Sequence, residues 1–154
     1  MELYFAYGSN LWTGQMHRRC PSTKVEAVAA LQGYRLWFPV QSQRWGGGVA
    51  SIAEDADSRV EGVLYRISWG DLKEMDRYEG VHVGMYRRVE VPVHVQEEVN
   101  SAWTYISRVD EGAPFPTTGD YIGTILRGAI EHGLSEGWIR FLKDFPVRDQ
   151  RADP

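Results

Sequence analysis

Cysteine is nearly absent from this chain, since Cys20 is the only one among its 154 residues. A single cysteine excludes an intrachain disulfide, and it fits a reducing compartment more simply than an oxidising one. The sequence also lacks any uninterrupted apolar run close to the roughly 20 residues that a membrane-spanning helix requires. Met1-Glu2 lead straight into a β-favouring stretch, without the basic head and apolar segment of a secretory leader. We therefore expect a cytoplasmic protein that has no membrane partner.

An excess of positive charge is missing as well, because 17 Lys and Arg stand against 21 Asp and Glu and give a net charge of −4 at pH 7. Phosphate backbones bind to concentrated positive faces, so this balance argues against a nucleic-acid partner. The glycines after Trp45 are not followed by the lysine and the helix of a phosphate-binding loop. No two histidines have metal-ligand spacing on one helix. These absences argue against nucleic-acid, nucleotide and metal sites.

What the chain does contain is enough apolar sequence, 43% of its residues, for one compact domain with its own core. Most of the apolar residues alternate as they do in β-strands, and three or four short segments have helical spacing. This mixture predicts an α+β domain built on a small mixed, curved or barrel-like β-sheet with a few short flanking helices. We expect the domain to span residues 1–146 and a polar tail to span residues 147–154.

The expected elements follow from alternation, capping residues and turn residues. Strands are expected at residues 25–31, 34–38, 48–52, 60–67, 86–95 and 102–106, and helices at residues 11–19, 69–79, 121–130 and 135–144. We expect a loop at residues 39–43 and a hairpin turn at the acidic residues 54, 55 and 57. His17, Arg18 and Arg19 are expected to form a solvated face of the first helix.

The most informative stretch is Tyr4–Leu11, which reads YFAYGSNL. Aromatic and β-favouring residues run straight into Gly8, which predicts a buried strand that stops at a tight turn. Because Gly8 has wide backbone freedom and Ser9 and Asn10 can hydrogen-bond locally, successive N–H groups can point into one concavity. Such a hollow binds a carboxylate or an oxygen on which negative charge develops. The alternative is a tight connection without chemistry, and these residues alone leave both open.

Glu79 is the second residue that the sequence singles out. Ser68 is a good N-cap for the helix that follows it, and Gly80 is expected to close that helix in the left-handed conformation. Glu79 then lies at the negative end of the helix dipole, which disfavours its charge by about 0.3 to 1 kcal/mol on an exposed surface. If it points inward instead, burial and the dipole both raise its pKa and suit it to proton transfer near neutral pH. Spacing alone leaves both positions open.

Further short motifs stand in a fixed order along nearly the whole chain. They are Arg19-Cys20-Pro21, Leu31-Gln32-Gly33-Tyr34-Arg35-Leu36, Trp45-Gly46-Gly47, Glu79-Gly80-Val81, Gly84-Met85-Tyr86, Gly128-Ala129, Glu131 and Gly133-Leu134. Together with the opening motif, they make the sequence resemble the γ-glutamylcyclotransferases, the AIG2-like family. One departure is Ser135, which stands where this family usually has proline after a Gly-Leu step.

The resemblance implies the γ-glutamylcyclotransferase fold and a residue-by-residue assignment of the site. The glutamate before Gly-Val, here Glu79, is implied as the general acid/base. The opening turn is implied to cradle the substrate, and the tyrosine that opens the late helix, here Tyr121, to contact it. The implied cradle residues are Tyr7, Gly8, Ser9, Asn10, Leu11 and Trp12. The implied partner is a small γ-glutamyl molecule, bound by a monomer or homodimer without a metal or other cofactor.

The implied reaction is an intramolecular ring closure. The α-amino group of a γ-glutamyl amide attacks its own γ-carbonyl, so that the amine is expelled and 5-oxoproline remains. Two other interpretations stay open: the same chemistry on a specialised γ-glutamyl amine or carrier-linked substrate, and a noncatalytic binding module of the same fold. An acidic residue at position 79 favours catalysis, because a binding hollow for anions gains nothing from a buried carboxylate.

Overall fold

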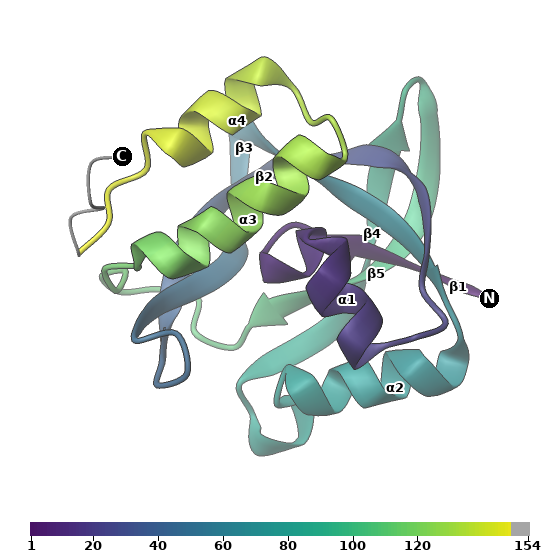
Figure 1. Cartoon of the computed structure of the whole chain (residues 1–154), viewed down its shortest axis with the longest axis horizontal. Coiled ribbons are helices and arrows are strands. Elements are labelled where there is room, and N and C mark those ends of the chain that lie inside the picture. Colours follow the sequence, from purple (N-terminus) through teal and green to yellow (C-terminus); the bar gives the residue numbers. More distant parts are fainter. Residues whose placement is uncertain (149–154) are drawn as a thin grey trace.

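The computed structural model, which describes residues 1–148, is organised around a closed five-stranded barrel (Figure 1). Its strands are β1 (Glu2–Ala6), β2 (Lys24–Ser42), β3 (Gly47–Ile67), β4 (Tyr86–Val95) and β5 (Glu98–Ser107). They are ordered β1-β3-β2-β4-β5, and β1 closes the barrel by pairing in parallel with β5 while the other pairs are antiparallel. Closure leaves no unpaired sheet edge along the ring. The expected α+β class with a mixed, barrel-like sheet is confirmed.

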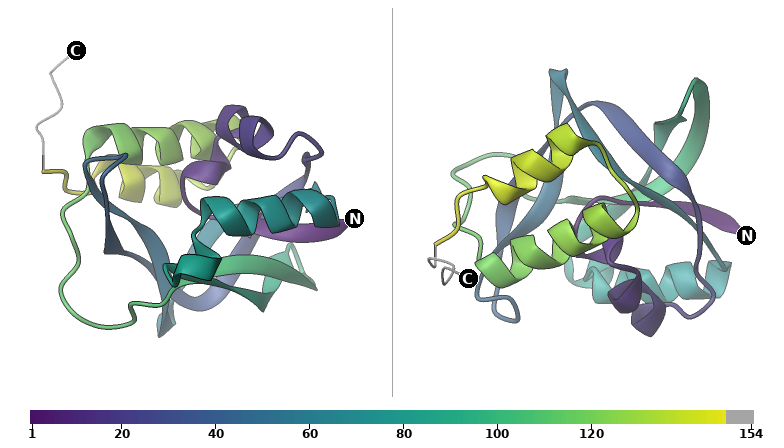
Figure 2. Two further views of the ribbon diagram at one scale, coloured as in Figure 1. Left: turned by 90° about the horizontal axis from the view of Figure 1, so that it is seen from below. Right: turned by 45° about the horizontal axis from the view of Figure 1, so that its top comes forward.

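Short helices cover the barrel in two groups. The helices are α1 (Thr13–Arg19), α2 (Trp69–Tyr78), α3 (Gly119–Glu131) and α4 (Glu136–Lys143), with single 3-10 turns η1 (Ser9–Leu11) and η2 (Val81–Val83). In Figure 2, α3 and α4 lie side by side, while α1 lies near α2. The opening turn η1 contacts both α3 and β1, so the segment that follows β1 lies between the barrel and this helix. No helix within residues 1–148 has the length and apolar character needed to cross a bilayer.

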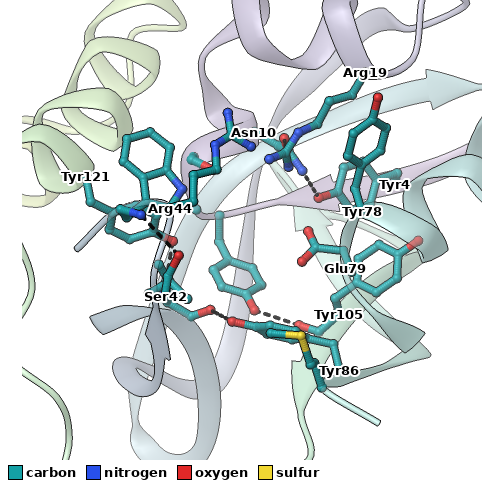
Figure 3. Close-up of a pocket in the computed structure, with 17 residues that line it drawn as sticks. Tyr4, Asn10, Arg19, Ser42, Arg44, Tyr78, Glu79, Tyr86, Tyr105 and Tyr121 are labelled. Carbon is teal, nitrogen blue, oxygen red and sulfur yellow. Dashed lines mark hydrogen bonds between the residues drawn. The ribbon is translucent and has the colours of Figure 1, made fainter. Parts of the chain in front are cut away.

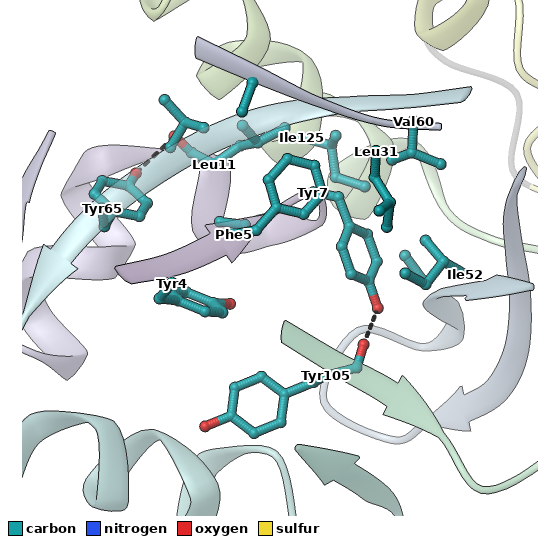
Figure 4. Packing of buried hydrophobic residues seen from close by; sticks show 14 of the residues in the cluster. Tyr4, Phe5, Tyr7, Leu11, Leu31, Ile52, Val60, Tyr65, Tyr105 and Ile125 are labelled. Atoms are coloured by element: carbon teal, nitrogen blue, oxygen red, sulfur yellow. Dashed lines mark hydrogen bonds between the residues drawn. The ribbon is translucent and has the colours of Figure 1, made fainter. Parts of the chain in front are cut away.

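The core fills the barrel and the space under the helices. Phe5, Leu31 and Val60 from three different strands are almost fully buried, and Ile125 of α3 closes the cluster from outside (Figure 4). Burying one such side chain contributes about 1.5 to 3 kcal/mol to folding. The core therefore holds β1 and α3 in fixed positions on either side of the opening turn.

The two long strands differ from the sequence expectation. Residues 25–31 and 34–38 belong to the single strand β2, which continues through the expected loop at 39–43 as far as Ser42. The acidic residues 54, 55 and 57 lie inside β3, so the expected hairpin turn there is wrong. The register between β2 and β3 shifts three times, once beside Gly33, whose φ is +81°. A bulge of this kind bends a strand around a barrel, and in sequence it resembles a turn.

The predicted caps of α2 and α4 are confirmed, whereas α1 begins at Thr13 instead of residue 11 and α3 spans Gly119–Glu131 instead of residues 121–130. Ser68 and Ser135 cap α2 and α4 by accepting hydrogen bonds from Asp71 N and Trp138 N, respectively. Gly80 has φ +64°, the left-handed conformation expected after α2. Of the expected tail, Val147 pairs with Thr117 in an isolated bridge, and residues 149–154 lie outside the described part of the chain.

Candidate active site

A cavity of about 230 Å³ opens at the end of β1, between the two groups of helices. Typical pockets for drug-sized ligands measure about 300 to 1,000 Å³, so this one suits a smaller molecule. Its wall is rich in phenol groups, as Figure 3 shows. The tyrosines that line it are Tyr4, Tyr7, Tyr78, Tyr86, Tyr105 and Tyr121.

One side of the cavity is the opening turn, residues 8–11. The N–H groups of Gly8, Ser9 and Asn10 donate no hydrogen bond to any residue in the described part of the chain, because a 3-10 turn begins here. The turn is fixed from behind by the phenol of Tyr65, which donates to the carbonyl oxygens of Asn10 and Leu11 at 2.8 and 3.1 Å. These N–H groups have no partner in the described part of the chain and belong to residues that line the cavity, an arrangement that the predicted hollow requires.

The side chain of Asn10 connects this turn to the rest of the wall. Its Nδ2 donates to the phenol oxygen of Tyr4 at 3.0 Å. Its Oδ1 accepts from Gln15 Nε2 at 3.0 Å and from Arg19 Nη1 at 3.2 Å. Gln15 also donates to the hydroxyl of Ser9 at 2.7 Å. Buried networks whose members are all satisfied are rigid, so this one fixes the turn against α1.

Glu79 lies on the opposite side of the cavity, immediately after the last residue of α2 (Figure 3). Of the two positions that the sequence left open, the structure has the inward one. Its carboxyl group accepts no hydrogen bond from a residue in the range 1–148. Burial raises its pKa to about 7, and the charge of Arg19 acts in the opposite direction. A carboxyl group with a pKa near neutrality can both take up and return a proton.

Two phenols of the wall keep a hydrogen that is not used inside the protein. The oxygen of Tyr121 accepts from Ala50 N at 2.9 Å, and the oxygen of Tyr4 accepts from Asn10. Neither phenol donates to another described residue. Burial raises the pKa of both, and the nearby Glu79 raises them further, so both stay protonated at neutral pH. Each can therefore donate a hydrogen bond into the cavity.

The structure brings most of the predicted site residues together and leaves two out. Glu79, Tyr7, Gly8, Ser9, Asn10 and Tyr121 all line the cavity. Leu11 does not, because it is fully buried under α3, where Gly128 lies against its backbone. Trp12 points elsewhere and stacks between Arg18 and Arg127, whose guanidinium carbons lie 5.1 and 4.7 Å from its ring. Of the expected cradle residues, Tyr7 to Asn10 therefore line the cavity, whereas Leu11 and Trp12 do not.

Sequence reasoning missed seven polar residues of the wall, which are Tyr4, Arg19, Ser42, Arg44, Tyr78, Tyr86 and Tyr105. Arg19, expected on a solvated face, lines the cavity and lies over the ring of Tyr78 at 5.0 Å. Its position three residues after the apolar Met16 was the available signal, because residues i and i+3 share one helical face. Tyr4 was assigned only to the first strand. Arg44 lies in the turn between β2 and β3, where nothing in the local sequence marks its role.

No group of three or more His, Cys, Asp or Glu side chains is placed to hold a metal ion within residues 1–148. The polar groups of the cavity are hydroxyls, backbone N–H groups, two guanidinium groups and one carboxyl group. This set can bind a small zwitterionic or anionic molecule and can exchange a proton with it.

The chain is similar to known proteins over most of its length. The model of the AIG2-like family matches residues 59–142. A human γ-glutamylcyclotransferase is 38% identical over 153 residues, which are 96% of this chain and 80% of the human protein. The bovine γ-glutamylcyclotransferase is 38% identical over 156 residues, covering 97% of this chain and 81% of its own length. A solved γ-glutamyl cyclotransferase structure superposes with a TM-score of 0.91 and 35% identity, covering 99% of this chain and 92% of that one.

Proposed function

Because this chain belongs to the AIG2-like family together with the γ-glutamylcyclotransferases, we propose that its cavity closes γ-glutamyl amides into 5-oxoproline with Glu79 as the proton carrier. The chain is an enzyme of the γ-glutamylcyclotransferase type. Its reaction is an acyl transfer within one molecule. The bond from the α-nitrogen to the γ-carbon forms, and the bond from the γ-carbon to the leaving nitrogen breaks.

The entropic part of the barrier is low because nucleophile and electrophile belong to one substrate molecule. The enzyme still has three tasks. It must hold the γ-glutamyl group in a bent conformation, stabilise the negative charge on the carbonyl oxygen, and move protons between the two nitrogens. A wall rich in tyrosines and a small volume support the first task. The turn at residues 8–10 and Glu79 support the other two.

In our mechanism, the carboxylate of Glu79 first removes a proton from the substrate's α-ammonium group. The freed amine attacks the γ-carbonyl carbon, and the carbonyl oxygen becomes negatively charged. Protonated Glu79 then gives its proton to the departing nitrogen, which leaves as a neutral amine. The regenerated carboxylate takes the second proton from the ring nitrogen, which becomes the amide N–H of 5-oxoproline, and passes this proton to the released amine or to solvent. The pKa of about 7 supports each of these steps, since a carboxyl group that titrates near neutrality can both accept and return a proton.

The oxyanion is stabilised in this mechanism by the N–H groups of Gly8, Ser9 and Asn10. Removing one such donor from an acyl-transfer enzyme typically lowers kcat about 100- to 1,000-fold. The phenol of Tyr121 lies next to this turn, because a Cβ atom added at Gly8 would be only 3.3 Å from its oxygen. Its unused hydrogen is a further donor to the same oxygen or to the substrate carboxylate.

The single observation that carries the proposal is that a carboxyl group of raised pKa and a row of unpartnered N–H groups belong to residues that line the same small cavity. The test is incubation with γ-glutamyl amino acids, γ-glutamyl amines, glutathione and ε-linked γ-glutamyl-lysine, with quantification of 5-oxoproline. We expect release from at least one simple γ-glutamyl amino acid. Release of 5-oxoproline only from a γ-glutamyl amine or a carrier-linked substrate supports the alternative of a specialised substrate. Measurable binding without any release of 5-oxoproline supports a noncatalytic binding module.

The proposal also covers the partners of the protein and its location in the cell. The net charge of −4 supports a function without a nucleic-acid partner. The buried, unpaired Cys20 supports a reducing, cytoplasmic location.

A further inference from the structure

A second guanidinium group at the cavity is not used by the proposed mechanism. Arg44 lies in the turn between Ser42 and Gly47 and lines the cavity. The turn is closed by a hydrogen bond from Gly46 N to Ser42 O of 2.9 Å, and Gly46 has φ +73°. Arg44 forms no hydrogen bond or ion pair with any residue of the described chain.

Aromatic contacts hold this arginine in relation to the site. Its guanidinium carbon lies 5.4 Å from the ring centroid of Trp45, and the Trp45 ring lies 5.1 Å from that of Tyr121. Tyr121 is in turn fixed by its hydrogen bond from Ala50 N. A cation stacked on a fixed aromatic ring is directed without being neutralised. Arg44 is therefore a positioned positive charge that still lacks a negative partner.

The two arginines of the cavity lie in different surroundings. Arg19 hydrogen-bonds Asn10, and its charge lowers the pKa of Glu79, so it belongs to the region of the proton carrier. Figure 3 shows Arg44 with Ser42 and Tyr121 across the cavity from Glu79 and Tyr105. The two positive groups can therefore bind two different anionic groups of one ligand.

A γ-glutamyl amino acid has two such groups. One carboxylate shares a carbon with the α-ammonium group, which meets Glu79 in the proposed mechanism, so this carboxylate lies on the side of Arg19. The other belongs to the departing amino acid, which leaves from the opposite end of the γ-carbonyl. Arginine binds carboxylates with two parallel hydrogen bonds when the geometry allows.

We propose that Arg44 binds the carboxylate of the leaving amino acid and thereby selects γ-glutamyl amino acids over γ-glutamyl amines. This inference rests on the proposed function and adds the residue that reads the leaving group. Because this carboxylate takes no part in the bond changes and is bound equally before and during reaction, the contact lowers KM and leaves kcat nearly unchanged.

The test compares γ-glutamyl-alanine with γ-glutamyl-ethylamide, which differ only in the leaving-group carboxylate. We expect the parent protein to favour γ-glutamyl-alanine about 10-fold or more in kcat/KM, as a charge-assisted hydrogen bond would give. Arg44→Gln is expected to raise KM for γ-glutamyl-alanine by a similar factor and to change kcat/KM for the ethylamide less than about twofold. Arg44→Lys is expected to keep part of the preference, because it retains the charge without the planar fork.

Arg35→Gln is the matched control. Arg35 is an exposed arginine of β2 that also stacks on a tryptophan, Trp37, at 5.2 Å, but it does not line the cavity. Removing it changes the net charge by the same amount, and the substrate preference is expected to stay at the parental value. A preference lost equally in both variants would show a general charge effect and would overturn the inference.

Three further results would also overturn it: no preference in the parent protein, a preference unchanged in Arg44→Gln, or equal losses on both substrates in that variant. Equilibrium binding of the two ligands to Glu79→Gln gives a readout that needs no turnover, and tighter binding of γ-glutamyl-alanine that depends on Arg44 would support the inference. Absence of cyclisation of both substrates by the parent protein would instead contradict the proposed function, so the two failures are distinguishable.

Discussion

Arg19 lies close enough to Glu79 for its positive charge to oppose the rise in carboxyl pKa that burial causes. The pKa of about 7 is the balance of these two effects. Since Glu79 must be ionised to accept a proton, kcat/KM is expected to rise as the pH increases through about 7. It should fall again at higher pH, as free substrate loses its α-ammonium proton. Initial rates of 5-oxoproline release between pH 5 and 9 measure both limbs, and a rate already at its plateau at pH 5 would contradict the assignment.

Replacing Arg19 moves this profile in a defined direction. Without the guanidinium, burial acts unopposed, so in Arg19→Gln the pKa of Glu79 rises and the acid limb shifts to higher pH. The rate also falls, because Asn10 loses a hydrogen bond of 3.2 Å, but the position of the limb is the diagnostic quantity. Arg18→Gln is the control, since Arg18 is exposed on the same helix and stacks on Trp12 away from the cavity. A limb that stays in place in Arg19→Gln would argue against the electrostatic coupling.

Neutralising the carboxyl group separates its role in catalysis from its effect on stability. Glu79→Gln removes the proton carrier and keeps the shape of the side chain, so we expect kcat to fall about 100-fold or more with the ligand still bound. The folded-state pKa is above the usual 4.5, so the unfolded chain ionises first and the parent loses stability as the pH rises from about 4.5 to 7. The variant has no such loss.

Above pH 7, Glu79→Gln should therefore be more stable than the parent by roughly 1 to 3 kcal/mol, while near pH 4 the two should be alike. Urea unfolding at the two pH values measures the difference. A variant that is equally stable at pH 8 would mean that the carboxylate is better solvated than its surroundings indicate, and near-parental release of 5-oxoproline would remove Glu79 from the mechanism.

Tyr86 and Tyr121 both hydrogen-bond the backbone of Ala50, but Tyr86 donates its hydrogen and Tyr121 accepts one. Tyr86 donates to the carbonyl oxygen of Ala50 at 2.7 Å, so its hydrogen is used, whereas Tyr121 accepts from Ala50 N and keeps its hydrogen. Each Phe variant loses one hydrogen bond with Ala50, which is typically about 1 kcal/mol of stability. We expect only Tyr121→Phe to lose about 10-fold or more in kcat. Similar kinetic losses in both variants would mean that Tyr121 acts only through packing.

The parts of the fold that local chemistry determines could be predicted from the sequence. Ser68, Ser135 and Gly80 mark helix ends because capping depends on one residue and its immediate neighbours. The long strands could not be predicted, because bulges such as the one beside Gly33 look like turns unless the partner strand is known. Closure of the barrel depends on pairing between residues as distant as Tyr4 and Trp103, which alternation in one strand does not specify.

The candidate site likewise contains residues that the sequence marks and residues that it does not. The turn at residues 8–10 and Glu79 stand out because each combines a polar residue with a backbone break. Their assembly into one cavity was an expectation from resemblance alone. Arg19 and Arg44 did not stand out, since an arginine on a helix or in a hairpin turn is usually solvated. Arg19 and Arg44 are part of the cavity wall only because Arg19 of α1 packs over Tyr78 and Trp45, on which Arg44 stacks, packs against Tyr121.

Two glycines of α3, Gly123 and Gly128, differ in the space that surrounds them. A Cβ atom at Gly128 would lie 2.3 Å from the carbonyl carbon of Leu11 and 2.5 Å from Trp12 N, both backbone atoms at the end of the opening turn. These atoms cannot rotate away, so Gly128→Ala must push α3 and the turn apart. A Cβ atom at Gly123 of the same helix would meet nothing within 4 Å. Gly123→Ala should therefore gain about 0.5 to 1 kcal/mol from helix propensity alone.

We expect Gly128→Ala to lose stability by about 1 to 3 kcal/mol, as overpacking of a filled interface does. At a temperature where this variant remains folded, turnover should fall by a larger factor than the folded fraction, because the N–H groups of Ser9 and Asn10 move with the turn. Thermal unfolding and kcat at 20 °C for both variants measure this. Parental kcat in folded Gly128→Ala would mean that the turn can shift without loss of function, and its N–H groups would then not be the oxyanion donors.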